Sequence, residues 1–96
     1  MPSLTQSHVT VTGAADEVVA AADAAAFTGV GVRVLALSAN DAAVWLGFSS
    51  GVSDSNGWEL EAGKEHFVSA HELRLGGALY AYAASGAQTL VKRVIG

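Results

Sequence analysis

The chain has 96 residues, the size of one domain, and we expect residues 1–96 to share a single hydrophobic core. It contains no cysteine, which excludes disulfides and thiolate metal sites. The formal net charge is −4 and the five basic residues are scattered, so the chain offers no basic stripe to a nucleic-acid backbone. We expect no secretory signal, because the first residues do not combine a basic start with an apolar stretch, and no membrane span, because no segment has roughly 18 uncharged apolar residues. We therefore expect a soluble, mildly acidic domain that is made inside the cell and binds neither membranes nor nucleic acids.

The hydrophobic content is less favourable than its 51% fraction indicates, because 19 of these residues are alanines. Alanine buries little apolar surface, so the remaining apolar side chains barely offset the entropy that the chain loses on folding. Small domains of this kind often gain stability by oligomerising. We therefore expect contacts with other copies or with a partner to supply part of the buried surface.

Most of the chain consists of short segments in which apolar and polar residues alternate, the period of a β-strand. Glycines and Ser/Asn/Asp clusters separate these segments, and Asn56 followed by Gly57 is a strong tight-turn signal. The expected strands cover residues 8–12, 29–37, 43–48, 58–61, 65–75 (as one strand or two), 79–83 and 89–95. Residues 1–7 are expected to form an N-terminal arm. Seven or eight short strands at this spacing predict an all-β fold, a single antiparallel β-sandwich or jelly-roll-like barrel.

The alanine-rich segment over residues 14–26 is ambiguous. By propensity it is the best helix of the chain, and Thr12 is a suitable N-cap with acidic residues following it. Against a helix, Val18 and Val19 are β-branched and no large apolar face appears at helical spacing. The sequence favours a strand followed by a loop and leaves a short helix open.

No arrangement of residues indicates a catalytic or metal site, and we expect neither enzymatic activity nor a cofactor. His66 and His71 are five residues apart, which places them on opposite faces of a continuous strand and disfavours joint metal ligation. Asp54 and Asn56 have the oxygens that calcium prefers, but they also suit a turn in which side chains bond their own backbone. Ser69 and His71 share a strand face without the glycine elbow of a serine hydrolase.

Aromatic residues at strand positions are the best candidates for a binding surface. Trp45 lies on the face opposite Val44 and Leu46, so it points outward if those two residues face the core. A tryptophan on the outside of a sheet typically marks a contact surface. The candidate interface anchors are Trp45, Phe48, Trp58 and Tyr82. A place in the local core, or a platform that stacks against a sugar ring, stays open for each.

The order of several glycine-punctuated segments matches a known pattern. These segments are Val44 to Gly47, Asn56 to Leu60, Glu61 to Lys64 and Leu79 to Gly86, preceded by a strand from Val32 to Ser38 that leads to Asn40. In this order they resemble a group of short tailed-phage virion proteins with the pattern V-x-L-G … x-x-G-x-x-L-x-x-G … L-Y-A-x-A-x-x-G … V-x-V. The similarity covers about positions 16 to 95 and rests on strands and glycines, with no functional residue set to carry over. The alanine-rich stretch and residues 66–74 do not match the pattern.

The resemblance implies a non-catalytic β-sandwich protein of the virion, made in the host cytoplasm. The first interpretation is a capsid decoration (cement) protein that binds the major capsid protein on the outer surface of a phage head as a homo-oligomer, with a trimer as the expected assembly. Many copies that each bury a modest patch would brace the shell, because contact with several subunits at once raises the effective concentration. The alternative is a tail, baseplate or head-fibre accessory protein that binds a receptor or glycan through exposed Trp and Tyr.

Overall fold

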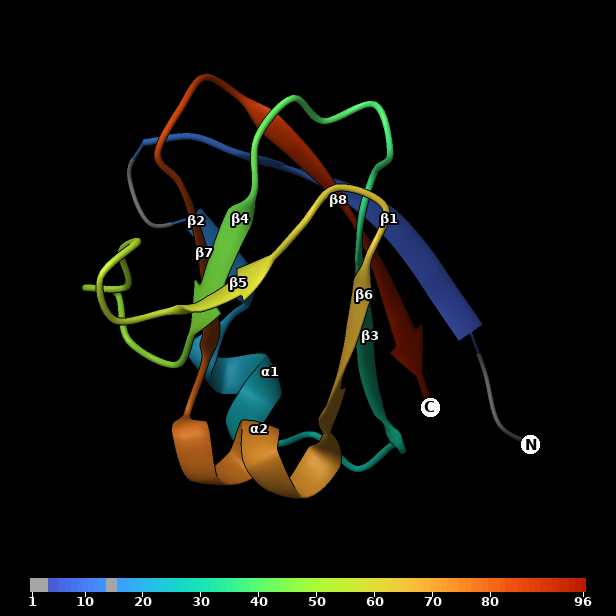
Figure 1. Ribbon diagram of the computed structural model, residues 1–96. Helices are drawn as coiled ribbons and strands as arrows, with labels where there is room; N and C mark the ends of the chain where they lie inside the picture. The colour runs from blue at the N-terminus through green and yellow to red at the C-terminus, as the bar shows by residue number, and fades with distance from the viewer. Residues whose placement is uncertain (1–3, 14–15) are drawn as a thin grey trace.

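Two antiparallel four-stranded sheets pack face to face in the computed structural model, which describes residues 4–13 and 16–96 (Figure 1). Sheet A has the strand order β1 (Leu4–Val11), β8 (Gln88–Ile95), β3 (Gly31–Ala36) and β6 (Glu65–Ser69). Sheet B has the order β2 (Asp16–Val19), β7 (Leu79–Ala83), β4 (Val44–Gly47) and β5 (Trp58–Leu60). Two short helices, α1 (Ala21–Ala25) and α2 (Ala70–Gly76), lie together at one end of the sandwich. The predicted all-β sandwich is confirmed.

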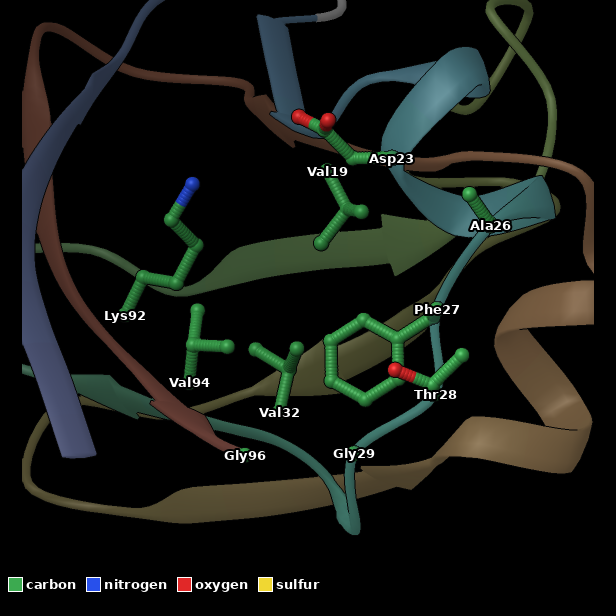
Figure 2. A pocket seen from close by; sticks show the side chains of 10 residues that line it. All are labelled: Val19, Asp23, Ala26, Phe27, Thr28, Gly29, Val32, Lys92, Val94 and Gly96. Carbon is green, nitrogen blue, oxygen red and sulfur yellow. The ribbon is translucent and has the colours of Figure 1, made fainter. Parts of the chain in front are cut away.

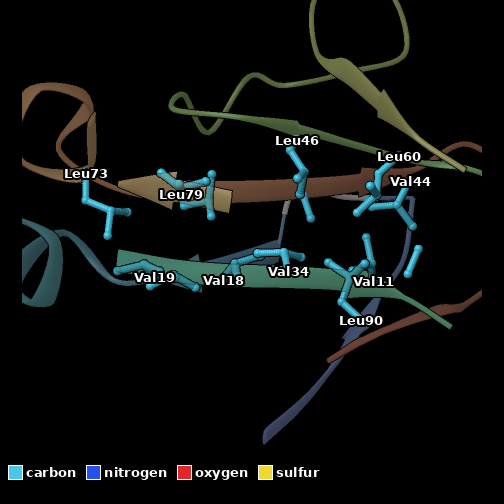
Figure 3. Packing of buried hydrophobic residues seen from close by; sticks show 14 of the residues in the cluster. Val11, Val18, Val19, Val34, Val44, Leu46, Leu60, Leu73, Leu79 and Leu90 are labelled. Carbon is cyan, nitrogen blue, oxygen red and sulfur yellow. The ribbon is translucent and has the colours of Figure 1, made fainter. Parts of the chain in front are cut away.

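Alternation along each strand places one apolar row from each sheet in the space between the sheets (Figure 3). In β3, Val32 and Val34 are fully buried, whereas Arg33 between them lies on the outer face. Leu46 and Leu79 reach into the same space from sheet B. Burying each side chain of this size contributes roughly 1.5–3 kcal/mol, so these rows hold the two sheets together.

The ambiguous alanine-rich segment contains both a strand and a helix. Val18 and Val19 are buried on β2, which pairs with β7, so the β-branched residues form a strand as their side chains favour. The helix α1 starts only after them and buries Ala24 alone. Thr12 does not cap a helix; its N–H donates instead to Asp16 Oδ2 at 2.8 Å. Residues 14–15, part of the expected segment, lie outside the described residues.

The expectation that residues 65–75 form strand throughout is wrong, because the chain enters helix α2 after Ser69. Ser69 Oγ accepts a hydrogen bond from the Glu72 N–H at 3.2 Å, and the Glu72 carboxylate accepts one from the Ser69 N–H at 3.3 Å. This reciprocal capping box fixes the first turn of the helix. Gly77 ends the helix with φ of 82°, a left-handed conformation that favours glycine. As a result Leu73 turns into the core, while Leu75 is 75% exposed.

Two amide side chains fasten the turn after β3 to the start of β8. Asn40 Nδ2 donates to the Thr89 carbonyl at 2.9 Å, and Asn40 Oδ1 accepts from the Thr89 N–H at 2.9 Å. The side chain thereby continues the sheet where β3 has ended. Gln88, which is 1% exposed, donates to Asp41 Oδ1 and to the Ser85 carbonyl, both at 2.7 Å. The asparagine that follows the strand in the sequence pattern thus has a structural role.

Two local expectations need correction. Strand β1 begins at Leu4 and pairs with β8 from its first residue, so an N-terminal arm over residues 1–7 is wrong for residues 4–7. Residues 1–3 lie outside the described part of the chain. Asn56 and Gly57 do not form a two-residue hairpin turn, since neither has the positive φ that a type I′ turn requires. They belong to a longer loop, in which Asn56 Oδ1 accepts from the Ser53 N–H at 2.8 Å.

Candidate docking surface

The outer face of sheet B carries three aromatic side chains, Trp45, Tyr80 and Tyr82, which we call the aromatic face. Trp45 on β4 is directly opposite Tyr82 on β7. Their neighbours along the strands, Leu46 and Ala81 among them, are fully buried, so the aromatic rings point away from the core. All three side chains are half-buried. Clustered Trp and Tyr are the residues that carry most of the binding energy in the centre of protein interfaces.

The loop over residues 48–57 borders this face. Val52 in the loop is 5% exposed and packs against Gly47 and Gly57. A Cβ atom at either glycine would lie 2.8 Å from Val52 Cγ2, and one at Gly57 would lie 2.9 Å from the Cβ of Trp45. The loop can therefore rest on β4 only because these two positions have no side chain, and it supports Trp45 from one side.

Carboxylates flank the aromatic face on both of its long sides. Glu59 on β5 is directly opposite Trp45, and Glu17 on β2 is directly opposite Tyr80. Both glutamates are exposed. The surface thus combines ring area with negative charge at its edges, which complements an apolar patch bordered by Lys or Arg on a partner.

The outer face of sheet A has a different chemistry. Arg33 and Arg93 are directly opposite each other on β3 and β8. Arg33 forms an ion pair with Glu65 at 3.4 Å. Arg93 donates from Nε and Nη2 to Gln6 Oε1, at 3.2 and 3.1 Å. These partners offset the repulsion that two like charges would otherwise suffer at opposed strand positions. Phe67 on β6 is also exposed on this face, but it is a single ring beside the Arg33 guanidinium, 6.0 Å from its centroid, so the clustered rings of the aromatic face are the better candidate for docking.

Phe48 and Trp58, two of the four expected anchors, do not lie on the aromatic face. Both pack against the hydrophobic core. Their ring centroids are 5.5 Å apart, and the Trp58 ring is 5.1 Å from the His66 ring on β6, so Trp58 bridges the edges of the two sheets. Only Trp45 and Tyr82 of the expected set come together. Tyr80 joins them, and its two-residue spacing from Tyr82 is the sequence signal that identifies it.

The histidines and the serine weighed as reactive groups are dispersed. His8 is on β1, the His66 ring lies tilted against that of Trp58, and His71 is exposed on α2. Ser69 uses its hydroxyl in the capping box, where Oγ also donates to Glu72 Oε1 at 3.2 Å. Across residues 4–13 and 16–96, no group of three or more His, Cys, Asp or Glu side chains is placed to hold a metal ion.

A cavity of about 380 Å³ lies between α1 with the segment after it and the inner face of β3 and β8 (Figure 2). Val19, Phe27, Val32 and Val94 form its apolar wall. The only ammonium group among its lining residues, that of Lys92, donates to the carbonyl of Val18 at 2.8 Å. Lys92 therefore has a backbone partner at the end of β2. The cavity also includes Asp23 and Thr28 among its lining residues, so its lining is partly apolar and partly polar.

The chain was compared with family models, curated proteins and solved structures. No family model, no curated protein and no solved structure matches the chain. Neither of the helices in the described residues has the length and apolar character needed to cross a membrane. The assignment of a function therefore rests on the surface chemistry of the sandwich and on the order of its segments.

Proposed function

We propose that the chain is a non-catalytic structural protein of a tailed-phage virion, a capsid decoration protein that binds the major capsid protein on the outside of the head as a homo-oligomer. The aromatic face is the observation that carries this proposal. The β-sandwich and the order of the strands and glycines from β3 to β8 support it, since both agree with the virion proteins that the sequence resembles.

The aromatic face suits low-affinity docking at many equivalent positions. It is one patch centred on Trp45 and Tyr82, bounded by Glu17, Glu59 and the loop over residues 48–57. Truncating one such anchor typically costs about 2 kcal/mol or more, whereas the charged rim tunes the association rate and its salt dependence. Repetition over a shell then converts a modest contact into firm attachment, because each copy engages several subunits.

The test is co-sedimentation of the purified full chain with undecorated head shells assembled from the major capsid protein encoded by the same genome. We expect saturable binding that weakens as salt is raised, since Glu17 and Glu59 border the contact. Shells that sediment without the chain at saturating protein would overturn the assignment to the head.

Substitution of the anchors locates the docking face. Trp45→Ala and Tyr82→Ala should each lower the affinity about thirtyfold, the equivalent of roughly 2 kcal/mol. Phe67→Ala is the matched control, because Phe67 is an aromatic residue that is 38% exposed on the opposite sheet. Circular dichroism and melting temperatures should confirm that all three variants fold. If Phe67→Ala weakens binding as much as Trp45→Ala, the docking face lies elsewhere.

A second candidate function follows from the same rings. Trp45 and Tyr82 are cross-strand neighbours on an exposed sheet face, an arrangement on which a sugar ring can stack. A tail, baseplate or head-fibre accessory protein would use it to bind a receptor glycan. A glycan array probed with the isolated chain separates the two functions: a signal that Trp45→Ala abolishes, together with absent shell binding, would replace the decoration protein by this alternative.

A further inference from the structure

We propose that strand β1 is a self-association edge, along which two copies of the chain pair antiparallel about a two-fold axis at Ser7. The two copies of sheet A would then form one continuous sheet. This inference concerns how the chain assembles with itself and does not depend on the docking of the aromatic face.

The four edge strands of the sandwich differ in how well they are protected against pairing. The edges of the sheets are β1 and β6 in sheet A, and β2 and β5 in sheet B. Strand β2 has four residues, a register shift and two acidic side chains; β5 has three residues and Glu59 at its centre; β6 carries Glu65 and runs directly into α2. Charges, bulges and short length are the devices that keep natural edges from associating.

Strand β1 has none of these devices. It is eight residues long, pairs with β8 without a register shift and contains no Asp, Glu, Lys, Arg or Pro. In Figure 1 it runs along the outside of sheet A, with β8 on one side only. A long, regular and uncharged edge presents a row of unpaired backbone groups, which is a template for another strand.

The hydrogen bonds of the neighbouring strand show which backbone groups of β1 face outward. Thr89 on β8 directs its N–H and carbonyl at Asn40, away from Thr10, its partner on β1. The backbone N–H and carbonyl of successive residues in a strand point to opposite sides. Gln6 and His8 therefore direct these groups to the same side as Thr10, which is the free edge. Those of Ser7 and Val9 point to β8. Within the described residues, the outward groups of Gln6, His8 and Thr10 have no backbone partner in sheet A.

A second copy of β1 satisfies these groups. In an antiparallel pair centred on Ser7, Gln6 of one copy is opposite His8 of the other, and residue 10 is opposite residue 4. Every outward-facing residue therefore meets an outward-facing residue. No charged side chain opposes its like, whereas self-pairing of β2 would bring Asp16 and Glu17 against their copies. Pairing about a two-fold axis gives dimers, in place of the trimers that the sequence resemblance implies.

The area of such a contact sets its strength. Addition of a single strand covers less than the roughly 800 Å² per partner of a stable interface, so the free dimer should be weak and depend on concentration. Weak pairing suits a chain that attains high local concentration when many copies gather on one particle.

Two proline variants test the direction of the backbone groups. His8→Pro removes an N–H that faces the free edge, so the fold should persist while the dimer is lost, since proline is tolerated at an edge. Val9→Pro removes an N–H that bonds to β8 and should lower the melting temperature, which makes it the matched control. Sedimentation velocity of the full chain from roughly 1 µM to 1 mM should show a monomer–dimer equilibrium for the wild type and monomer for His8→Pro.

Single cysteines test the register, because the chain has no cysteine of its own. In the proposed pair, Ser7 faces Ser7 of the second copy at about 4.5 Å between Cα atoms, within the range that a disulfide accepts. Two copies of Thr5 would be about 14 Å apart. Ser7→Cys should therefore form a covalent dimer under mild oxidation, and Thr5→Cys should not.

The outcomes decide the inference separately from the proposed function. A wild-type chain that stays monomeric up to about 1 mM, a His8→Pro variant that folds and keeps the wild-type mass, or equal cross-linking of Ser7→Cys and Thr5→Cys would each overturn β1 pairing. If the His8→Pro variant still binds shells through the aromatic face, the proposed decoration function holds whether or not the chain dimerises. If the wild type dimerises but does not bind shells, β1 pairing holds and the proposed function does not.

Discussion

Replacement of Asn40 by alanine should destabilise the fold far more than an ordinary substitution in a turn. The Asn40 side chain makes two hydrogen bonds to the backbone of Thr89, both at 2.9 Å and both partly buried. Alanine removes both, which leaves the Thr89 N–H without a side-chain partner, whereas the Thr89 carbonyl keeps the Leu37 N–H at 3.2 Å. Each hydrogen bond contributes about 1 kcal/mol net, so we expect a loss of about 2 kcal/mol in the free energy of unfolding. For a domain of this size that corresponds to a fall of roughly 8–16 °C in melting temperature.

Asn56→Ala is the control, because Asn56 also bonds two backbone groups, the Ser53 N–H at 2.8 Å and the Gly51 carbonyl at 3.1 Å, but does so in an exposed loop. Water can replace those bonds, so the loss should stay below about 1 kcal/mol. The assay is urea denaturation followed by tryptophan fluorescence, with the slope checked for constancy. If Asn40→Ala costs no more than Asn56→Ala, the amide does not hold β3 to β8 as we describe.

Three further changes in stability follow from the packing around α2. Gly76→Ala should destabilise by roughly 1–3 kcal/mol, since its Cβ would lie 2.2 Å from a ring carbon of Phe48, and a variant more stable than wild type would contradict that contact. Gly51→Ala, whose nearest contact would be 3.6 Å away, serves as its control in the same thermal melt. Leu73→Ala should cost roughly 2–5 kcal/mol in urea denaturation because the side chain is fully buried; a loss under 1 kcal/mol would refute its place in the core. Ser69→Ala should cost about 1 kcal/mol by removing the cap, and an unchanged melting temperature would show that α2 does not need it.

Alternation of polarity was sufficient to predict which side chains of most strands face the core. The rows of Val32 with Val34 and of Val44 with Leu46 are on the core side, as the two-residue period requires, and Trp45 is on the opposite face. The same rule explains why Tyr80 lies on the face of Tyr82, although the expected anchors included only Tyr82. These predictions succeed because the direction of a side chain along a strand depends on parity alone.

Alternation failed where another local signal competed with it. Between Ser69 and Gly77 the apolar residues fit a strand, but the capping box and the left-handed glycine fit a helix, and the helix formed. The alanine-rich segment is divided between strand β2 and helix α1. The burial of Val18 and Val19 sets the point where the strand ends and the helix begins. Periodicity over so few residues does not separate the two structures.

The class of fold, the inward rows and the outward position of Trp45 could all be predicted from the sequence, because each follows from spacing along one strand. The packing of the strands was needed to show that Phe48 and Trp58 lie against the core while Trp45 and Tyr82 share a surface. The same packing places β1 at an edge of sheet A. Which strands become neighbours depends on contacts between residues far apart in the chain, and a local pattern carries no information about those pairings.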